Sequence, residues 1–193
     1  ASTLLVVGAG RLAALLPHAH AAVRKLRQVN LWARRPEAAE ALAARLRAEG
    51  LPAQAVHDLP RAVAEAHIVS TATLSTEPLV RGQWLTAGSH LDLVGSFTPA
   101  MREADDDALR GARIVPDTEE AAAKSGDLLE PLQRGVIVPA DVADTLATLC
   151  RGEVPGRRSP EQRTVFKSVG TALEDLAAAR RVWAAVQPGA AGG

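Results

Sequence analysis

The sequence is poor in the residues that disulfides, thiolate metal sites and aromatic stacking surfaces require. Cys150 is the single cysteine, so neither an intrachain disulfide nor a thiolate cluster can form. Aromatic residues make up 3% of the chain and tyrosine is absent, which argues against a surface that stacks single-stranded bases. Cys150 lies in a segment typical of a helix, and we expect it to be a small buried hydrophobic residue.

The chain also lacks an excess of charge of either sign. Lys and Arg total 22, Asp and Glu total 22, and the formal net charge is zero. This balance argues against general binding to nucleic acids or anionic membrane surfaces. There is no apolar run near the ~18 residues of a transmembrane helix, and no signal-peptide pattern. We therefore expect a cytoplasmic protein, and we expect no metal site.

A short apolar run followed at once by glycines is the strongest local pattern in the chain. The run Leu4–Val7 predicts a buried strand, and a helix is expected from Arg11 to about Leu26. Between them, Gly8 allows a tight turn, Gly10 lets a pyrophosphate approach the backbone, and Ala13 permits close packing of helix and strand. The spacing indicates a dinucleotide-binding turn. The alternative is an ordinary tight turn between strand and helix.

Strand-like and helix-like segments alternate along the rest of the chain. Further strands are predicted at residues 28–33, 52–56, 68–73, 91–96, 113–117 and 164–168. The alternation predicts a Rossmann-type α/β fold, a doubly wound and mostly parallel sheet with helices on both faces. A helix is expected at 140–151, a turn at Ser125–Asp127, and a long helix at 169–186 that covers one sheet face. We expect one domain over residues 1–187 and a flexible tail at 188–193.

The end of the second predicted strand bears on the choice of coenzyme. NAD-binding proteins usually place Asp or Glu about 20 residues after the glycines, and that count reaches Ala33 here. Arg34 and Arg35 follow, and a guanidinium group matches a phosphate dianion. The pattern favours NADPH, with NADH as the alternative. The competing interpretation makes both arginines solvated residues at a helix start.

Hydroxyl side chains gather where the fourth predicted strand ends. They belong to Thr71, Thr73, Ser75 and Thr76. Ligands of open α/β sheets lie beyond the carboxyl ends of the strands, so these hydroxyls can line a cofactor. Hydrogen bonding within the loop is an equally good interpretation.

Several sequence blocks, in matching order, are similar to the ornithine cyclodeaminase/mu-crystallin family. They are the segments 7–10 (VGAG), 31–36 (LWARRP), 71–79 (TATLSTEPL), 94–103 (VGSFTPAMRE), 125–127 (SGD), 164–170 (TVFKSVG) and 174–176 (EDL). The resemblance spans nearly the whole chain. It implies a Rossmann domain that binds NAD or NADP and hydride transfer at a carbon that bears nitrogen.

The resemblance also implies roles for individual residues. The cofactor contacts it implies are Gly8, Ala9, Gly10, Arg11 and Leu12 at the pyrophosphate; Ala33, Arg34 and Arg35 around the adenosine ribose and its phosphate; Thr71, Thr73 and Leu74 along the adenosine side; and Val94, Gly95 and Ser168 at the nicotinamide. Ser96 and Phe97 would border the substrate. Lys167 would help to orient the site and is the candidate catalytic residue, unless it is a solvated or helix-capping lysine.

Members of this family carry a further domain before the Rossmann domain. That domain makes the dimer and supplies Lys and Arg side chains that hold the substrate carboxylate. The present sequence begins where the Rossmann domain begins, so we expect the substrate-binding half to be absent from it. A homodimer is expected where that domain is present.

One departure from the family pattern separates the candidate activities. Cyclodeaminases and alanine dehydrogenases of the family carry an Asp where this sequence has Phe97, and a phenyl ring does no acid–base work. The variant is most similar to the imine-reductase branch, which implies reduction of small cyclic imino acids such as 1-pyrroline-2-carboxylate or 1-piperideine-2-carboxylate. Ornithine cyclodeaminase is the second hypothesis, and a non-catalytic NADPH-binding protein is the third.

Overall fold

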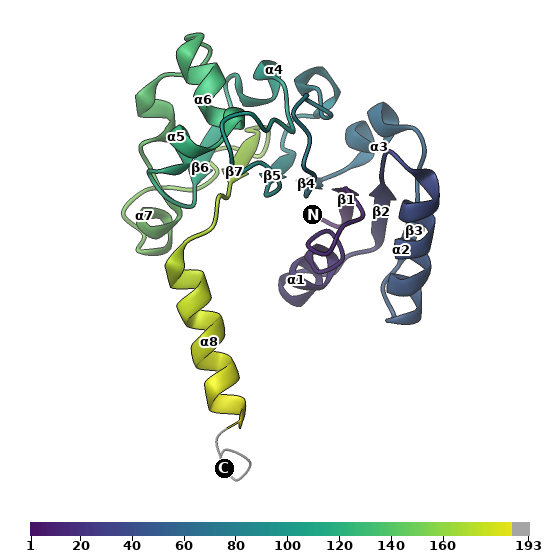
Figure 1. The fold of residues 1–193 in the computed structure, drawn as a ribbon. Coiled ribbons are helices and arrows are strands. Elements are labelled where there is room, and N and C mark those ends of the chain that lie inside the picture. The colour runs from purple at the N-terminus through teal and green to yellow at the C-terminus, as the bar shows by residue number, and fades with distance from the viewer. Residues whose placement is uncertain (187–193) are drawn as a thin grey trace.

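A single parallel sheet forms the centre of the molecule. The structure is a computed structural model, and it describes residues 1–186. Seven strands lie in the order β3-β2-β1-β4-β5-β7-β6, as Figure 1 shows. They are β1 (Thr3–Val7), β2 (Gln28–Trp32), β3 (Ala53–Ala55), β4 (Ile68–Thr71), β5 (His90–Leu93), β6 (Arg113–Pro116) and β7 (Thr164–Lys167). This confirms the predicted doubly wound fold. The predicted tail at 188–193 lies outside the described residues.

Eight α-helices and two short 3-10 turns lie in the described residues, most of them in the connections between the strands. They are α1 (Leu16–Val23), α2 (Pro36–Ala48), α3 (Leu59–Glu65), α4 (Asp106–Leu109), α5 (Ala121–Lys124), α6 (Gly126–Gln133), α7 (Leu146–Cys150) and α8 (Ala172–Val186), with 3-10 turns η1 (Gly82–Trp84) and η2 (Pro139–Val142). Three of them, α1, α2 and α3, begin at a proline-containing first turn, where the missing N–H costs nothing.

Strand β1 shows why the sheet is buried on both sides. Leu4, Leu5, Val6 and Val7 are all 0% exposed. Leu4 and Val6 belong to the core cluster that contains α2, whereas Leu5 and Val7 belong to the cluster that contains α3, α4 and α6. Successive side chains of a strand point to opposite faces, so a strand covered on both faces is apolar at every position.

Helix α1 begins later than the sequence predicts. Residues 11–15 form turns, and α1 starts at Leu16 rather than at Arg11. Pro17 explains the shift, because it has no N–H to bond to the carbonyl of Ala13 and is tolerated only in a first helical turn. The turns at 11–15 thus separate the glycines from the first residue of α1.

Three further local predictions are wrong. Ser125–Asp127 is the start of α6 rather than a turn, since the Ser125 hydroxyl accepts a hydrogen bond from the Asp127 N–H and caps the helix. The helix predicted at 140–151 is divided into η2 and α7, and Thr145 caps α7. Cys150 is exposed rather than buried, because α7 packs none of its side chains into the core of the described residues.

Helix α8 does not cover the sheet. Figure 1 shows it leaving the body of the molecule after β7, and all of its side chains are exposed in the structure of residues 1–186. The chain changes direction at Gly170, whose φ is +83°. Leu173, Leu176 and Trp183 are 76%, 55% and 67% exposed, so an apolar stripe remains open on this helix. The expectation that residues 169–186 cover a sheet face is therefore wrong.

Candidate dinucleotide site

The turn after β1 sits directly against the end of β4. Gly8 has a φ of +126°, and a Cβ built on it would lie 2.6 Å from the carbonyl oxygen of Ala72. No other residue fits this position without moving the backbone of β4. At Gly10, by contrast, a Cβ would meet no heavy atom within 4 Å among the described residues. The fold therefore requires the first glycine, while the second faces open space where a ligand can approach.

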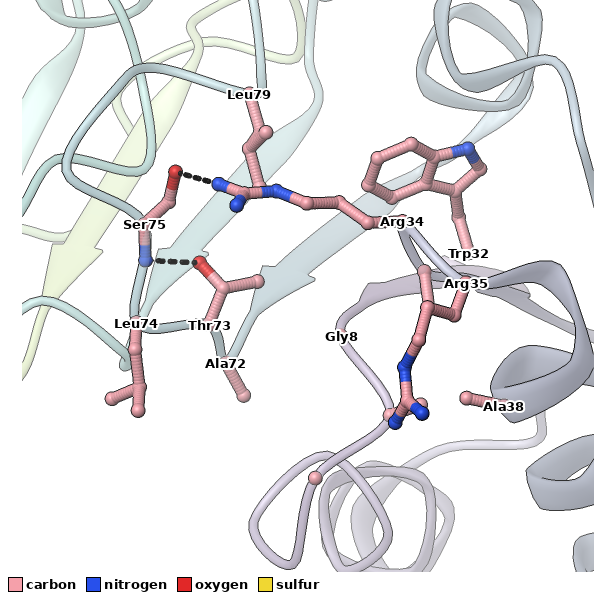
Figure 2. Close-up of a pocket in the computed structure, with 13 residues that line it drawn as sticks. Gly8, Trp32, Arg34, Arg35, Ala38, Ala72, Thr73, Leu74, Ser75 and Leu79 are labelled. Carbon is pink, nitrogen blue, oxygen red and sulfur yellow. Dashed lines mark hydrogen bonds between the residues drawn. The ribbon is translucent and has the colours of Figure 1, made fainter.

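A pocket of about 490 Å³ opens beside this turn (Figure 2), and we call it the glycine-turn pocket. Its lining comprises Gly8, Ala9, Gly10, Trp32, Ala33, Arg34, Arg35, Ala38, Ala72, Thr73, Leu74, Ser75 and Leu79. These residues follow or end β1, β2 and β4. Strand β1 lies between β2 and β4, so the pocket marks the point at which the direction of winding reverses. Ligands of doubly wound sheets bind at this switch point.

Two arginines give the pocket its charge. Figure 2 shows Arg34 extending across to Ser75, while Arg35 points toward the turn that contains Gly8. The Arg34 guanidinium donates a hydrogen bond to the Ser75 hydroxyl, with a nitrogen–oxygen distance of 2.6 Å. No carboxylate belongs to the pocket lining within residues 1–186. A hollow with two guanidinium groups, an open glycine and no acidic side chain suits an anionic ligand.

The segment after β5 forms the neighbouring part of the site. Gly95 is buried, and a Cβ on it would lie 2.2 Å from the carbonyl oxygen of Thr73. The Ser96 side chain is 0% exposed, and its hydroxyl bonds the Met101 carbonyl and the Ser125 hydroxyl. Phe97 is 50% exposed. The Ser96 hydroxyl is thus occupied within the fold, and the substrate contacts assigned to Ser96 and Phe97 stay predictions.

A carboxylate fixes the loop that follows β7. Asp117 Oδ2 accepts hydrogen bonds from the Val169 and Gly170 N–H groups at 2.7 and 2.8 Å, and from the Ser168 hydroxyl at 3.1 Å. The partly buried Ser168 side chain is thus held toward β6. The nicotinamide contact assigned to Ser168 stays a prediction.

Lys167, the last residue of β7, is buried near acidic side chains. It is 0% exposed, so it is not a solvated lysine. Its Nζ donates to the Leu93 carbonyl at 3.0 Å and lies 3.4 Å from Asp127 Oδ2. Burial lowers the pKa of Lys167, and the charge of Asp127 opposes that shift. Burial also raises the pKa of Glu103, against the hydrogen bonds that two threonines donate to it. A role for Lys167 in a reaction stays a prediction.

The pocket brings together eight of the cofactor contacts predicted from the sequence. They are Gly8, Ala9, Gly10, Ala33, Arg34, Arg35, Thr73 and Leu74. Arg11 lines an adjoining hollow, Leu12 is half-exposed in the turn, and Val94 is half-buried after β5. Thr71 is 0% exposed and its hydroxyl donates to Glu103 Oε2 at 2.7 Å, so its side chain does not reach the pocket.

Two kinds of site residue carry little or no signal in the sequence. Trp32 and Leu79 line the pocket, and only the position of Trp32 directly before Ala33 signals this. Glu103 and Asp127 carry no local signal, because most of their partners lie 23 to 40 residues away along the chain. Within residues 1–186, no three His, Cys, Asp or Glu side chains gather in a way that would hold a metal ion. None of the helices there has the length and apolar character needed to span a bilayer.

Comparison with known proteins gives relatives that are consistently longer than this chain. It is 42% identical over 177 residues to the Delta(1)-pyrroline-2-carboxylate reductase of Paracoccus denitrificans, covering 90% of the chain and 55% of the relative. It is 39% identical over 184 residues to Protein SAR DEFICIENT 4 of Arabidopsis thaliana, covering 93% and 57%. The chain thus spans little more than half the length of the curated relatives it matches.

A solved structure gives the same match in three dimensions. The Delta(1)-pyrroline-2-carboxylate reductase of Thermococcus litoralis, in complex with NADH and L-proline, superposes with a TM-score of 0.89 at 30% identity. The match covers 93% of this chain and 56% of that one. The model of the ornithine cyclodeaminase/mu-crystallin family matches residues 1–189. The resemblance drawn from the sequence blocks is therefore confirmed, and the chain belongs to the ornithine cyclodeaminase/mu-crystallin family.

Proposed function

We propose that this chain is the dinucleotide-binding part of an NAD(P)H-dependent reductase of small cyclic imino acids, of which 1-pyrroline-2-carboxylate and 1-piperideine-2-carboxylate are the leading candidates. The observation that carries the proposal is the glycine-turn pocket, which places Gly10, Arg34 and Arg35 around one hollow at the switch point of the sheet. The reductase names of the Paracoccus and Thermococcus relatives support the substrate class.

The residues of the pocket fit a dinucleotide phosphate. The backbone at Gly10 is open to a pyrophosphate, since a Cβ there would meet nothing within 4 Å among the described residues. Arg34 and Arg35 would hold a 2′-phosphate on the adenosine ribose, and their pairing favours NADPH over NADH. When bound, the reduced coenzyme supplies hydride, and the chain's own task is to orient it above the acceptor carbon.

Phe97 favours reduction over deamination. Its ring is half-exposed beside the segment that follows β5, where it would border the substrate and exclude water. It offers no proton donor or acceptor, and a protonated imine requires little acid–base assistance to accept hydride. Lys167 would help to orient the segment that contains Phe97, because its Nζ donates a hydrogen bond to the carbonyl of Leu93 at the end of β5.

The proposal includes a second domain upstream of this chain and a cytoplasmic homodimer built through it. The greater length of the relatives supports the further domain. The open apolar stripe of α8, which includes Leu173, Leu176 and Trp183, supports it independently, because such a stripe is typical of a helix that packs against another surface. The intact mass of the natural protein tests this part directly.

Purified full-length protein tests the activity. We expect loss of reduced-nicotinamide absorbance when NADPH is mixed with either cyclic imino acid. Release of proline and ammonia from ornithine, with no consumption of NADPH by the imino acids, would instead establish the cyclodeaminase. Tight coenzyme binding with no turnover of any of these compounds would indicate a binding protein.

A further inference from the structure

A single buried carboxyl group joins the ends of two neighbouring strands. Glu103 is 0% exposed. Its Oε1 accepts from the Thr73 N–H at 2.6 Å and from the Thr73 hydroxyl at 2.7 Å. Its Oε2 accepts from the Thr71 hydroxyl at 2.7 Å and from the Gly95 N–H at 2.8 Å. Thr73 follows β4 and Gly95 follows β5, so each oxygen of the carboxyl group holds one loop backbone.

The loop at Thr73 and the loop at Gly95 are in direct backbone contact. A Cβ on Gly95 would lie 2.3 Å from the Thr73 nitrogen and 2.4 Å from Glu103 Oε1. Real Cβ atoms do not approach other atoms so closely, and the backbone of one loop therefore rests directly on the other. The position of the Thr73 backbone relative to the Gly95 backbone, at the carboxyl ends of β4 and β5, therefore depends on the carboxyl group that bridges them.

Asp127 in turn fixes the backbone at Glu103. The Glu103 and Ala104 N–H groups donate to Asp127 Oδ1 at 2.8 and 3.1 Å. The other oxygen of Asp127 faces Lys167 Nζ, which also donates to the Leu93 carbonyl at the end of β5. The network closes on itself: α6 supplies Asp127, β7 supplies Lys167, and both lead back to the segment at Leu93–Gly95.

The location of this network relates it to the coenzyme. A dinucleotide lies across the switch point of a doubly wound sheet, with one half on each side. The glycine-turn pocket is lined by residues that follow β1, β2 and β4, with Thr73 on its β4 wall, which leaves the carboxyl end of β5 for the other half. We propose that Glu103 is a positioning residue: by bonding both Thr73, on the wall of the glycine-turn pocket, and Gly95, it sets the position of the Gly95 loop beneath the nicotinamide half of the coenzyme.

The chemistry of the four contacts favours a carboxyl group over an amide. Each oxygen of Glu103 has two neighbouring donors, and two of the four donors are backbone N–H groups that cannot reverse. An amide in the same place would turn its NH₂ toward N–H donors and lose contacts on one loop. Replacement by Gln therefore keeps the size of the side chain but releases one loop from the other.

Coenzyme binding by the full-length protein tests this inference, which rests on the proposed dinucleotide binding. The ligands are NADPH and adenosine 2′,5′-bisphosphate, which carries only the adenosine end. We expect Glu103→Gln to weaken NADPH binding about tenfold, which corresponds to ~1.4 kcal/mol, while the bisphosphate affinity stays within about twofold. Thr71→Val removes one of the four donors and should give a smaller loss with the same selectivity. Glu120→Gln, at an exposed pair with Lys124, should change neither affinity.

The outcomes separate the positioning role from a general structural one. Equal weakening of both ligands by Glu103→Gln, or unchanged binding of NADPH, would overturn the inference. If Glu103→Gln does not fold, Thr71→Val decides by the same comparison. A wild-type protein that binds neither ligand would overturn the proposed function itself, and this inference with it.

Discussion

The side chains of Arg34 and Ser75, separated by 41 residues in the sequence, meet across the glycine-turn pocket in a hydrogen bond of 2.6 Å. Figure 2 shows this bond joining the end of β2 to the loop after β4. The Ser75 hydroxyl is neutral, and it already donates to the Glu77 carbonyl. A phosphate dianion is a much stronger acceptor for a guanidinium group than a hydroxyl is. The bond therefore holds Arg34 extended over the pocket until a stronger acceptor arrives.

Replacement of Arg34 by Ala should change the coenzyme preference. A hydrogen bond to a charged group contributes about 1.5–3 kcal/mol, so the dissociation constant for NADPH should rise roughly 10- to 100-fold. NADH lacks the 2′-phosphate, and its dissociation constant should change little. Titration calorimetry with both coenzymes measures the difference. Arg61→Ala, at an exposed pair with Glu65 on α3, is the matched control. Equal losses for the two coenzymes would show that Arg34 does not recognise the phosphate.

The two glycines of the turn should respond differently to the same substitution. Gly8→Ala puts a Cβ against the Ala72 carbonyl at a positive φ, so we expect a lower midpoint in thermal unfolding. Gly10→Ala has open space in the described residues, so the midpoint should stay unchanged while coenzyme affinity falls. Thermal unfolding with and without NADPH checks both variants. Undiminished coenzyme binding by Gly10→Ala would contradict the assignment of the pyrophosphate to this turn.

The buried Glu103 should make stability depend on pH in the acidic range. Burial raises its pKa above the ordinary 4.5, so between 4.5 and the raised value the native state keeps a proton that the unfolded chain has lost. The free energy of unfolding contributed by this group is therefore largest below pH 4.5 and declines as pH rises through the raised pKa. Denaturant unfolding of wild type and Glu103→Gln across this range measures it. A stability difference that grows with pH would contradict the assignment.

Lys167 and Asp127 should behave as a coupled pair. Their side chains are 0% and 1% exposed, and removal of one partner of a buried pair costs about 3–5 kcal/mol because the other charge is left without compensation. We expect Lys167→Met and Asp127→Asn each to lower the free energy of unfolding strongly. The double variant should lose less than the sum of the two. Lys124→Met, at an exposed pair, should have little effect. Strictly additive losses would refute the coupling.

Trp183 reports on whether α8 packs against a further domain. It is 67% exposed in residues 1–186. In the full-length protein we expect bluer emission and weaker quenching by acrylamide than in the chain of residues 1–193. Trp32→Phe and Trp84→Phe, made together, leave Trp183 as the single tryptophan of residues 1–193, and every tryptophan of the further domain is replaced by Phe in the full-length protein. Identical emission and quenching in the two would contradict the proposed packing of α8.

The sequence predicts those features of the fold that depend on neighbouring residues. Gly8 was predicted correctly because a tight turn after a buried strand needs a glycine, whatever the distant chain does. The start of α1 was missed, although Pro17 marks it within a few residues. Glu103 was not identified from the sequence, and for Lys167 the family resemblance gave the residue but not its burial, since both side chains are buried against partners that the sheet brings together. The stripe on α8 predicts that the helix packs, but periodicity does not identify the surface against which it does so.

Strand β7 lies between β5 and β6 although it is the last of the seven along the chain. During synthesis, β5 and β6 leave the ribosome without the strand that must separate them, and they cannot acquire their final neighbours until residues 164–167 emerge. The half of the sheet that carries the glycine turn has no such dependence, because β1 to β4 pair among themselves. The half of the sheet that carries the glycine turn can therefore form its strand pairs before β7 is made, whereas β7 completes the other half by insertion rather than by addition at an edge.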